Sequence, residues 1–507
     1  MKLLLCTIKT DRRYTDYELS SLYSVVADSP LDVDMRIFNK YELDGSIYEE
    51  IIRGKYSIVY LHCDELNVRH ISMVAEMVKK AAPSTAIVVG GMQVSFETRN
   101  YMKANPWVDY VIRGEGETVL FNFLKSLLDY EFDFESINGL AFRNGDTVVV
   151  NNYDEPVEMD DLPFVYDKTD TIGGTVYYET ARGNADRTVY SQYIPDSTVR
   201  TLSLNRVCRE LRYFLVKEVE RVVFFDRWFN FNSERAYRIF EYLINNDNGV
   251  TTFEFDICGD NLDEETVRLL GEAREGLFEF NIDVASTNAE VLDAIGRKAN
   301  IYQLMYNVTK LLQTGKVRIN LSVTAGLPLE TEALFGRSFN KVYGLGEGSP
   351  LKIKDIRVAK GTVLRYNADK FGYVYTDEAP YDVICTDHLS AVEMIDLRTM
   401  ARVVDAYLGN GGFKASLPRI MNDTGIKPYD LFHSLTEFIY SKGYGTRLHR
   451  KDQLARLLYA WATDLYYQFD DTLKLDILRD AVHADLEKEL PEDAMIKFER
   501  AGWSIED

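Results

Sequence analysis

Four carboxylic acids in the middle of the chain each stand at the end of a short apolar run. They are Glu179, Asp226, Asp256 and Asp283. If those runs are strands of one barrel, the four side chains form a ring at its mouth. Such a ring suits a hard metal ion or acid and base catalysis, so these are the candidate catalytic residues. Burying several like charges is costly without a cation, and salt bridges to Arg182 and Arg227 are therefore the preferred alternative.

A second group of potential ligands, His62, Cys63, Asp64 and Glu65, follows the apolar run YSIVYLH. Side chains alternate between the two faces of a strand, so at most two of the four can share one site. The alternative, a polar loop without a ligand, is favoured.

The five cysteines are scattered through the chain without a CxxC or any other close pair: Cys6, Cys63, Cys208, Cys258 and Cys385. Their spacing predicts neither a disulfide framework nor a zinc site, and it fits a reducing cytosol. No apolar run approaches the ~20 residues of a membrane span. We therefore expect a cytoplasmic protein without a signal peptide.

The elements that must position these side chains begin with an α/β domain at residues 1–130. Its apolar runs, such as KLLLCTI, YSIVYLH and TAIVVGG, are separated by helical patterns such as HISMVAEMVKKAA. This alternation predicts a Rossmann-like, doubly wound parallel sheet. Ligands of such sheets lie beyond the carboxyl ends of the strands, here near residues 7–10, 62–67, 90–95 and 113–117.

Glycines at two of these strand ends would allow the backbone to approach a large ligand closely. They are Gly90, Gly91, Gly114 and Gly116. Plain turns use the same residues, so the signal is weak alone.

Three further regions follow. Residues 131–173 contain FRNGDTVVVNN, which predicts a hairpin turning at Asn144-Gly145, and an acidic linker. Residues 174–390 repeat strand and helix patterns six times and predict a partial (β/α)6 barrel. Residues 391–507 show helical periodicity and predict a helical C-terminal domain.

The 507 residues carry a formal net charge of -22. Binding to phosphates needs clustered lysine and arginine, so neither nucleic acid nor an anionic membrane is the expected partner. Solubility is the simpler explanation of this charge.

The order of parts resembles the cobalamin-binding radical SAM family, in an anaerobe-type branch. The resemblance rests on VVGGMQVSFET, VDYVIRGEGETVLFNFL, YYETARG and TAGLPLET, and it runs over most of the chain. It implies a Rossmann-like cobalamin-binding domain followed by a radical-SAM-type barrel.

That family carries a loop of the form RGCPxxCxxC, whose three thiolates hold a four-iron four-sulfur cluster. Here Arg182 and Gly183 match the first two residues of that loop. Asn184, Thr188 and Ser191 stand at the three cysteine positions. An amide and two hydroxyls are hard, weak ligands, and iron-sulfur clusters need soft thiolates. The resemblance therefore implies a degenerate loop, and we expect no cluster.

The positions that correspond to the family's S-adenosylmethionine site also depart from the family pattern. On the fourth barrel strand this chain has Asn281, Asp283 and Ala285 before Ser286. A carboxylate at Asp283 would repel the carboxylate of methionine. We expect an eroded S-adenosylmethionine site, and three substitutions introduced into an otherwise ordinary enzyme would not explain these changes.

For cobalamin, the resemblance implies a corrinoid bound at the loops that follow the strands of the first domain, with the residues near His62 at its lower face. The candidate cofactor-binding residues are His62, Cys63, Asn67, Gly90, Gly91, Ser95, Gly114, Glu115 and Gly116. An inherited domain that no longer binds its ligand is the alternative.

Two functions follow. The first is a cluster-free, cobalamin-binding carrier, sensor or accessory subunit, with a possible partner protein. The second is an enzyme with replaced chemistry, either cobalamin-dependent polar methyl transfer or catalysis by a carboxylate-bound metal in the barrel. The substrate, a small molecule or a peptide, is not specified by the sequence.

Overall fold

In the computed structural model, the apolar runs at the start of the chain form a seven-stranded sheet in the order β2-β1-β3-β4-β5-β6-β7. The first five strands run parallel: β1 (Lys2–Lys9), β2 (Asp32–Asn39), β3 (Ile58–His62), β4 (Ala86–Gly90) and β5 (Tyr110–Ile112). The last two, β6 (Leu140–Asn144) and β7 (Thr147–Val150), are antiparallel.

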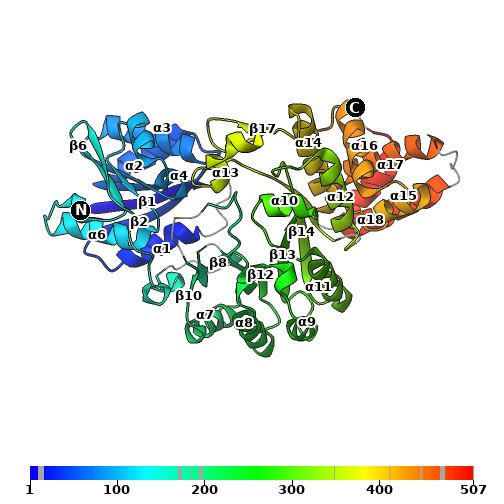
Figure 1. The fold of residues 1–507 in the computed structure, drawn as a ribbon, viewed down its shortest axis with the longest axis horizontal. Helices are drawn as coiled ribbons and strands as arrows, with labels where there is room; N and C mark the ends of the chain where they lie inside the picture. The colour runs from blue at the N-terminus through cyan, green and yellow to red at the C-terminus, as the bar shows by residue number, and fades with distance from the viewer. Residues whose placement is uncertain are drawn as a thin grey trace. The chain divides into compact units, whose positions relative to one another are not determined.

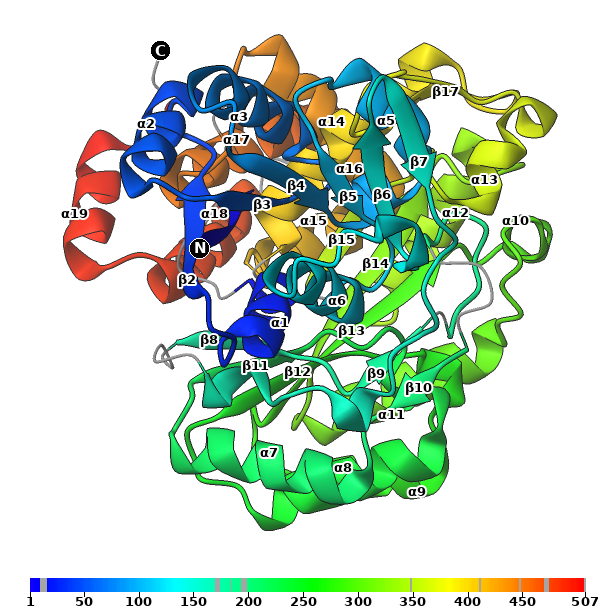
Figure 2. The same ribbon diagram turned by 90° about the vertical axis from the view of Figure 1, so that its left-hand side faces the viewer.

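Helices cover both faces of this sheet because alternate side chains of each strand point to opposite faces. Leu3 and Leu5 belong to one apolar core, with α1 (Tyr17–Val26) and α6 (Gly116–Leu128). Leu4 and Cys6 belong to the other, with α2 (Asp44–Gly54), α3 (Val68–Ala81) and α5 (Thr98–Ala104). Figure 2 shows the two helix layers on either side of the strands.

The β6–β7 hairpin turns where the sequence predicts it. Asn144 pairs with Thr147, and Gly145 has φ of +60°, a left-handed conformation that favours glycine. Tyr110 of β5 pairs with Phe142, so the hairpin extends the first sheet.

A second series of strands and helices follows. The strands β8 (Thr175–Tyr178), β11 (Arg221–Phe224) and β12 (Thr252–Asp256) are parallel, with α7 (Leu204–Val216) and α8 (Ser233–Asn245) between them. Asn232 caps α8 by accepting a hydrogen bond from the Arg235 amide. A short antiparallel pair, β9 (Ala181–Arg182) and β10 (Arg200–Thr201), lies in the connection after β8.

The rest of the chain continues the pattern and then becomes helical (Figure 1). The strands β13 (Phe278–Ala285), β14 (Arg318–Ala325) and β15 (Leu351–Asp355) are parallel. Their helices are α9 (Glu264–Leu270), α10 (Ala289–Ala294), α11 (Ile301–Thr314) and α12 (Glu332–Tyr343). The C-terminal helices are α14 (Ala391–Leu408), α15 (Ser416–Thr424), α16 (Pro428–Ser441), α17 (Lys451–Gln468), α18 (Leu475–Glu489) and α19 (Glu492–Ala501).

The structure describes residues 1–9, 16–168, 174–183, 185–192, 198–346, 349–409, 412–445, 448–468 and 474–505. They divide into two units. Unit 1 contains residues 1–255, 358–366 and 377–381, and unit 2 contains residues 256–357, 367–376 and 382–507. Segments 358–366, which includes α13 (Val363–Tyr366), and 377–381 come back to unit 1 after much of unit 2; we call them the return segment.

The return segment packs against the end of α4 (Met92–Ser95) and the residues that follow it. Lys360 Nζ lies 3.3 Å from Glu97 Oε2. Gln93 Nε2 donates to Tyr381 Oη at 2.6 Å. Leu364 N also donates to the Val189 carbonyl at 2.7 Å, so the segment joins the loop after β9 to the first domain.

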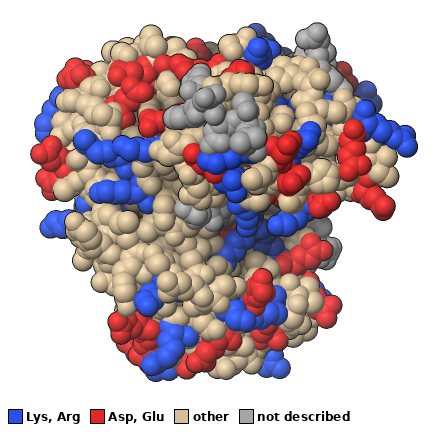
Figure 3. Space-filling model, turned by 90° about the vertical axis from the view of Figure 1, so that its right-hand side faces the viewer, with Lys and Arg blue, Asp and Glu red and all other residues tan. Residues whose placement is uncertain are grey.

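The predicted fold class is confirmed: a Rossmann-like N-terminal domain, a parallel-stranded barrel segment and a helical C-terminal region. Among the described residues, no helix is both long and apolar enough to cross a membrane. On the face shown in Figure 3, acidic and basic side chains are interspersed.

Candidate functional site

A cavity of about 290 Å³ lies at the carboxyl ends of the strands in unit 1. Loops of the first sheet line one side, with His62, Gly91, Met92, Gly114, Glu115, Gly116 and Glu117. The connection after β8 lines the other, with Glu179, Ala181, Arg182, Gly183 and Gln192. Helix α1 adds Tyr17, Glu18 and Leu22. The cavity volume lies near the lower limit of about 300 Å³ for small-molecule sites, so a large ligand would extend beyond it.

Glycine is required at the end of β4 for reasons of packing. A side chain at Gly90 would overlap the hydroxyl of Tyr60. At Gly91, φ is +110° and a Cβ atom would overlap the carbonyl oxygen of Cys63. These glycines are therefore needed because other atoms of the protein lie close to them. The backbone of Gly91 also carries no side chain where the loop lines the cavity.

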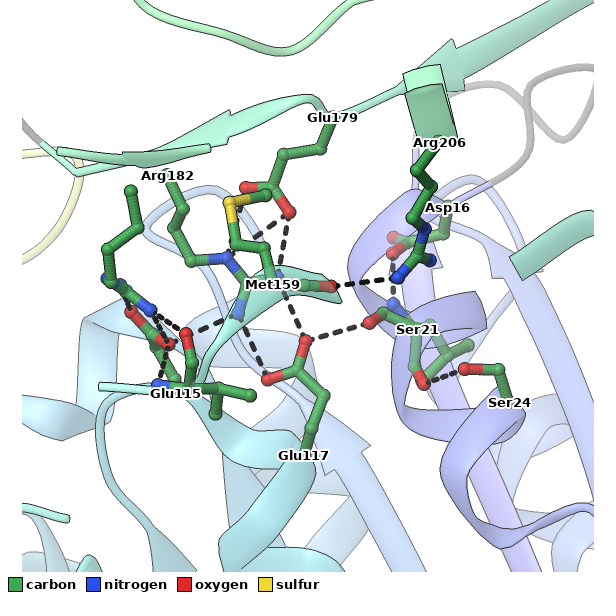
Figure 4. A network of polar contacts seen from close by, with 12 residues as sticks. Asp16, Ser21, Ser24, Glu115, Glu117, Met159, Glu179, Arg182 and Arg206 are labelled. Carbon is green, nitrogen blue, oxygen red and sulfur yellow. Dashed lines mark hydrogen bonds and ion pairs between the residues drawn. The ribbon is translucent and has the colours of Figure 1, made fainter. Parts of the chain in front are cut away.

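Arg182 is the centre of a buried ion-pair cluster in the cavity wall. Its guanidinium lies 2.7 Å from Glu179 Oε2, 3.0 Å from Glu117 Oε1 and 3.3 Å from Glu115 Oε2. Figure 4 shows the three carboxylates converging on it. Arg200 also pairs with Glu115, so two guanidinium groups are shared among three carboxylates.

The cluster shifts two of its carboxyl groups in opposite directions. Burial favours the neutral form of Glu117, but the Arg182 charge and hydrogen bonds from Arg182 and Ser21 outweigh it and lower the pKa. Burial raises the pKa of Glu179, and Arg182 offsets only part of this effect. Glu117 is therefore an ionised anchor, whereas Glu179 can take up and release a proton nearer neutral pH.

His62 and Glu18 form a second charged pair in the cavity wall. His62 Nε2 lies 2.6 Å from Glu18 Oε2, and His62 is only 5% exposed. Burial alone lowers the pKa of His62, but Glu18 outweighs it and the net shift is upward. Glu18 is more open, with 47% of its side chain exposed, and the charge and hydrogen bond of His62 lower the pKa of that carboxyl to about 2. The pair is held as imidazolium and carboxylate.

The loop after β9 carries a network of oxygen and nitrogen groups. Thr188 Oγ1 and Ser191 Oγ are 2.7 Å apart, and Ser191 Oγ donates to Asp186 Oδ1 at 2.9 Å. Arg227 Nη1 donates to Ser191 Oγ at 2.8 Å. Asn184, the first of the three predicted cluster positions, lies outside the described residues.

The four candidate catalytic carboxylates have different surroundings. Glu179 pairs with Arg182, as the salt-bridge alternative predicts. Asp226 is buried and accepts hydrogen bonds from the amide and the hydroxyl of Thr180, and burial raises its pKa to about 7. In unit 2, Asp283 accepts a hydrogen bond from Ser322 at 2.7 Å, and Asp256 is exposed. The described residues include no group of three or more His, Cys, Asp and Glu side chains placed to hold a metal ion.

The candidate cofactor-binding residues divide into two sets. Those that line the cavity are His62, Gly91, Gly114, Glu115 and Gly116. The others stand behind them: Asn67 Nδ2 donates to the His62 carbonyl at 3.2 Å, and Ser95 Oγ accepts from Gly114 N at 2.9 Å. Cys63 is fully buried in the apolar core. These contacts fix the loops that form the cavity.

Several cavity residues are not among the sequence candidates. Tyr17 and Glu18 come from the first turn of α1. Glu117, in the first turn of α6, lies within the predicted ligand region 113–117 but is not named among the binding residues. The first turn of each helix that follows a strand lies at the same edge of the sheet, and this rule would have found all three.

Family comparisons match three consecutive regions of the chain. Residues 8–124 match the B12 binding domain, residues 188–342 match the radical SAM superfamily, and residues 369–502 match a protein family of unknown function, DUF4080. The chain is a B12-binding radical SAM protein with a DUF4080 C-terminal region.

Individual proteins resemble this radical SAM protein over most of its length. The 2-(S-pantetheinyl)-carbapenam-3-carboxylate methyltransferase of Streptantibioticus cattleyicolor is 22% identical, over 89% of this chain and 69% of its own. The structure of the cobalamin-dependent S-adenosylmethionine radical enzyme OxsB, with aqua-cobalamin and S-adenosylmethionine bound, matches with a TM-score of 0.62 and 13% identity, over 99% of this chain and 83% of its own.

A second solved structure is that of the radical S-adenosylmethionine methyltransferase TsrM from Kitasatospora setae, with cobalamin and a [4Fe-4S] cluster bound. It matches with a TM-score of 0.58 and 14% identity, over 75% of this chain and 76% of its own. At these identities the two structures establish a shared fold.

The cavity of this B12-binding protein has features that fit a corrinoid. All of its lining residues from the first sheet fall within residues 8–124, the matched B12 binding domain. The loops at Gly91, Gly114 and Gly116 present no side chain to the cavity, and His62 Nδ1 is buried without a hydrogen-bond partner among the described residues. A corrinoid carries amide side chains and a phosphodiester that such groups can bind.

Proposed function

We propose that this chain is a cobalamin-dependent enzyme that transfers methyl groups by polar displacement, without a four-iron four-sulfur cluster. The observation that carries the proposal is the hydrogen-bonded Thr188–Ser191 pair in the loop where the radical SAM match begins. This is the second of the two functions that the sequence suggests.

The side chains of this loop are poor ligands for an iron-sulfur cluster. Reductive cleavage of S-adenosylmethionine requires a cluster, and the cluster requires soft thiolates. Thr188 and Ser191 carry neutral hydroxyls that bind each other, Asp186 and Arg227. Among the five cysteines, Cys6 and Cys63 are buried in the core of the first domain, away from this loop in the sequence.

Methyl transfer is favoured over a carrier role by the named relatives. The Streptantibioticus protein is a methyltransferase by name, and so is TsrM. Catalysis by a carboxylate-bound metal has less support, because the described residues offer no cluster of three metal ligands.

The chain's own residues would prepare the cavity for this reaction. Bound cobalamin would supply a carrier for a methyl group between a donor and a nucleophilic acceptor. When an acceptor X–H takes the methyl group, it releases one proton, and ionised Glu179 lines the cavity and can accept it. Its raised pKa makes it a stronger base than an ordinary carboxylate.

The absence of a cluster can be tested by restoring the thiols. After anaerobic reconstitution with iron and sulfide, the wild-type protein should hold no stoichiometric iron. The triple variant Asn184→Cys, Thr188→Cys, Ser191→Cys should gain iron and the visible absorbance of a cluster, and Thr188→Cys alone is its control. About four iron atoms on the wild-type chain would overturn the proposal. A triple variant that gains no iron would show that the loop is not a former cluster site.

Methyl transfer can be tested with methylcobalamin and a set of small thiol and amine acceptors. We expect protein-dependent loss of methylcobalamin absorbance and a methylated acceptor detected by mass spectrometry. Glu179→Gln keeps the shape of the side chain and removes the base, so it should lower the rate by about 10²–10⁴-fold while cobalamin still binds. Tight cobalamin binding with no transfer to any acceptor would favour the carrier function instead.

A further inference from the structure

His62 has one nitrogen whose hydrogen-bonding requirement is unmet. Its Nε2 donates to Glu18 at 2.6 Å, and Nδ1 is buried without a partner among the described residues. An imidazolium ion donates from both nitrogens, so the Nδ1–H group lacks an acceptor. A buried donor left unpaired is unfavourable, and native proteins rarely keep one without a reason.

The charges around His62 favour the imidazolium form. Glu18 and Asp16 of the α1 region attract its positive charge, and Lys9 of β1 opposes it. Lys9 is itself held by Asp16 at 3.2 Å and by Asp64 at 3.1 Å, so its charge is largely balanced. Together these groups raise the pKa of His62 despite its burial.

The cavity can provide the missing acceptor, because His62 is one of its lining residues. Asn67 holds the strand end from behind, with Nδ2 donating to the His62 carbonyl at 3.2 Å and to Thr7 Oγ1 at 3.2 Å. The imidazole is therefore fixed on two sides, by Glu18 through the ring and by Asn67 through the backbone. The ring thus forms part of the cavity wall, and a ligand contact to Nδ1 requires the atoms that cover this nitrogen to make room for the ligand.

We propose that His62, positioned by Glu18, binds an oxygen acceptor of the corrinoid through Nδ1–H and does not coordinate the cobalt. This inference rests on the proposed cobalamin function and names the residue that recognises the ligand. The acceptor is an amide carbonyl or the phosphodiester of the nucleotide tail, which share the chemistry of an oxygen acceptor.

The test measures the dissociation constant of hydroxocobalamin by absorbance titration of the full chain. His62→Phe removes both donors at similar size and should weaken binding about 10- to 100-fold, the range expected for one hydrogen bond from a charged donor. His62→Gln keeps an N–H donor and should recover part of the loss. His70→Phe is the matched control, because His70 also pairs with a carboxylate, Asp44 at 2.9 Å, but does not line the cavity.

The pH dependence separates recognition from a merely structural role. Wild-type binding should be constant at low pH and weaken as the pH rises through the raised pKa of His62. His62→Gln should show no such change. Unchanged affinity in His62→Phe, with normal thermal unfolding, would overturn the inference, whereas failure of the wild type to bind cobalamin would overturn the proposed function itself.

Two further measurements identify the acceptor and exclude coordination. Cobinamide has the amide side chains and lacks the nucleotide tail. A His62→Phe penalty that persists with cobinamide assigns the acceptor to an amide, and a penalty seen with hydroxocobalamin alone assigns it to the tail; either supports the inference. In the electron paramagnetic resonance spectrum of the reduced, cobalt(II) form, nitrogen splitting that disappears in His62→Phe would show coordination to cobalt and overturn it.

Discussion

At the scale of single residues, burial and the nearest cation decide which carboxyl groups are charged. Glu117 has both Arg182 and a hydroxyl, and its pKa is lowered. Asp226 is only 1% exposed and relies on hydrogen bonds from Thr180, so burial raises its pKa to about 7. The pKa values of these two buried carboxyl groups in unit 1 are thus shifted in opposite directions.

Asp226 should make the protein less stable as the pH rises. Its folded pKa of about 7 lies above its ordinary value of 3.8, so the folded chain holds an extra proton between these values. The free energy of unfolding therefore falls as the pH increases from about 4 to 7. Asp226→Asn should remove this fall, worth up to about 4 kcal/mol at about 1.4 kcal/mol per pKa unit.

Urea unfolding at pH 4 and pH 8 measures this prediction. The matched control is Asp256→Asn, because Asp256 also stands at a strand end but is exposed. It should change stability by less than about 0.5 kcal/mol at both pH values. Equal pH dependence in the wild type and Asp226→Asn would show that Asp226 titrates as an ordinary aspartate.

The sequence predicts part of this chemistry. The Glu179–Arg182 pair is foreseeable because its members are only three positions apart in the sequence. Glu115 and Glu117 also pair with Arg182, although they precede it by more than 60 residues. No local sequence pattern predicts that contact. The sequence also does not predict that His62 Nδ1 lacks a hydrogen-bond partner among the described residues, because this depends on which ring nitrogen faces Glu18.

At the scale of elements, the return segment links parts of unit 1 that are distant in sequence. Gly361 has φ of +78°, and a Cβ atom there would overlap the ring of Phe96. Lys360 and Arg365 both approach Glu97, at 3.3 and 3.4 Å. The segment can follow this path because glycine stands at its closest point.

Gly361→Ala should therefore loosen the return segment. The left-handed backbone costs an alanine about 1–2 kcal/mol, and the overlap with Phe96 adds to this. We expect lower stability of unit 1 in urea and faster proteolysis within residues 358–381. Gly45→Ala is the control, because nothing lies within 4 Å of its added Cβ atom and alanine favours the helix that contains it. If the two variants behave alike, the segment is not held at Gly361.

Elements with strong patterns are the ones that the sequence predicts well. Apolar runs such as KLLLCTI become β1 because both faces of a parallel strand are buried, and Asn144-Gly145 makes the hairpin turn. The return segment, by contrast, has no periodicity of its own. It is defined by contacts to Gln93 and Glu97, and long-range contacts of this kind leave no local signal.

At the scale of the whole molecule, the two units each have their own tryptophans. Trp107 and Trp228 belong to unit 1, and Trp461 and Trp503 belong to unit 2. The cavity is lined by unit 1 alone. A ligand that binds there acts on the stability of that unit.

Cobalamin should therefore raise the stability of one unit selectively. At 100 times its dissociation constant, hydroxocobalamin should add about 2.7 kcal/mol to the unfolding free energy reported by Trp107 and Trp228. Denaturant unfolding of a Trp461→Phe, Trp503→Phe variant, followed by fluorescence, measures this effect. The complementary variant, which keeps Trp461 and Trp503, should change little; an equal shift in both would mean that the units unfold together.

The residues that form the cavity wall are also synthesised at different times. Residues 1–117 leave the ribosome with one half of the wall, while Arg182 and Glu179 emerge some 60 residues later. At typical synthesis rates the delay is a few seconds, and the nascent N-terminal domain spends it with Glu117 lacking its arginine. Cobalamin should therefore bind only after the first barrel strand has been translated. A nascent chain arrested before Arg182 should bind cobalamin weakly.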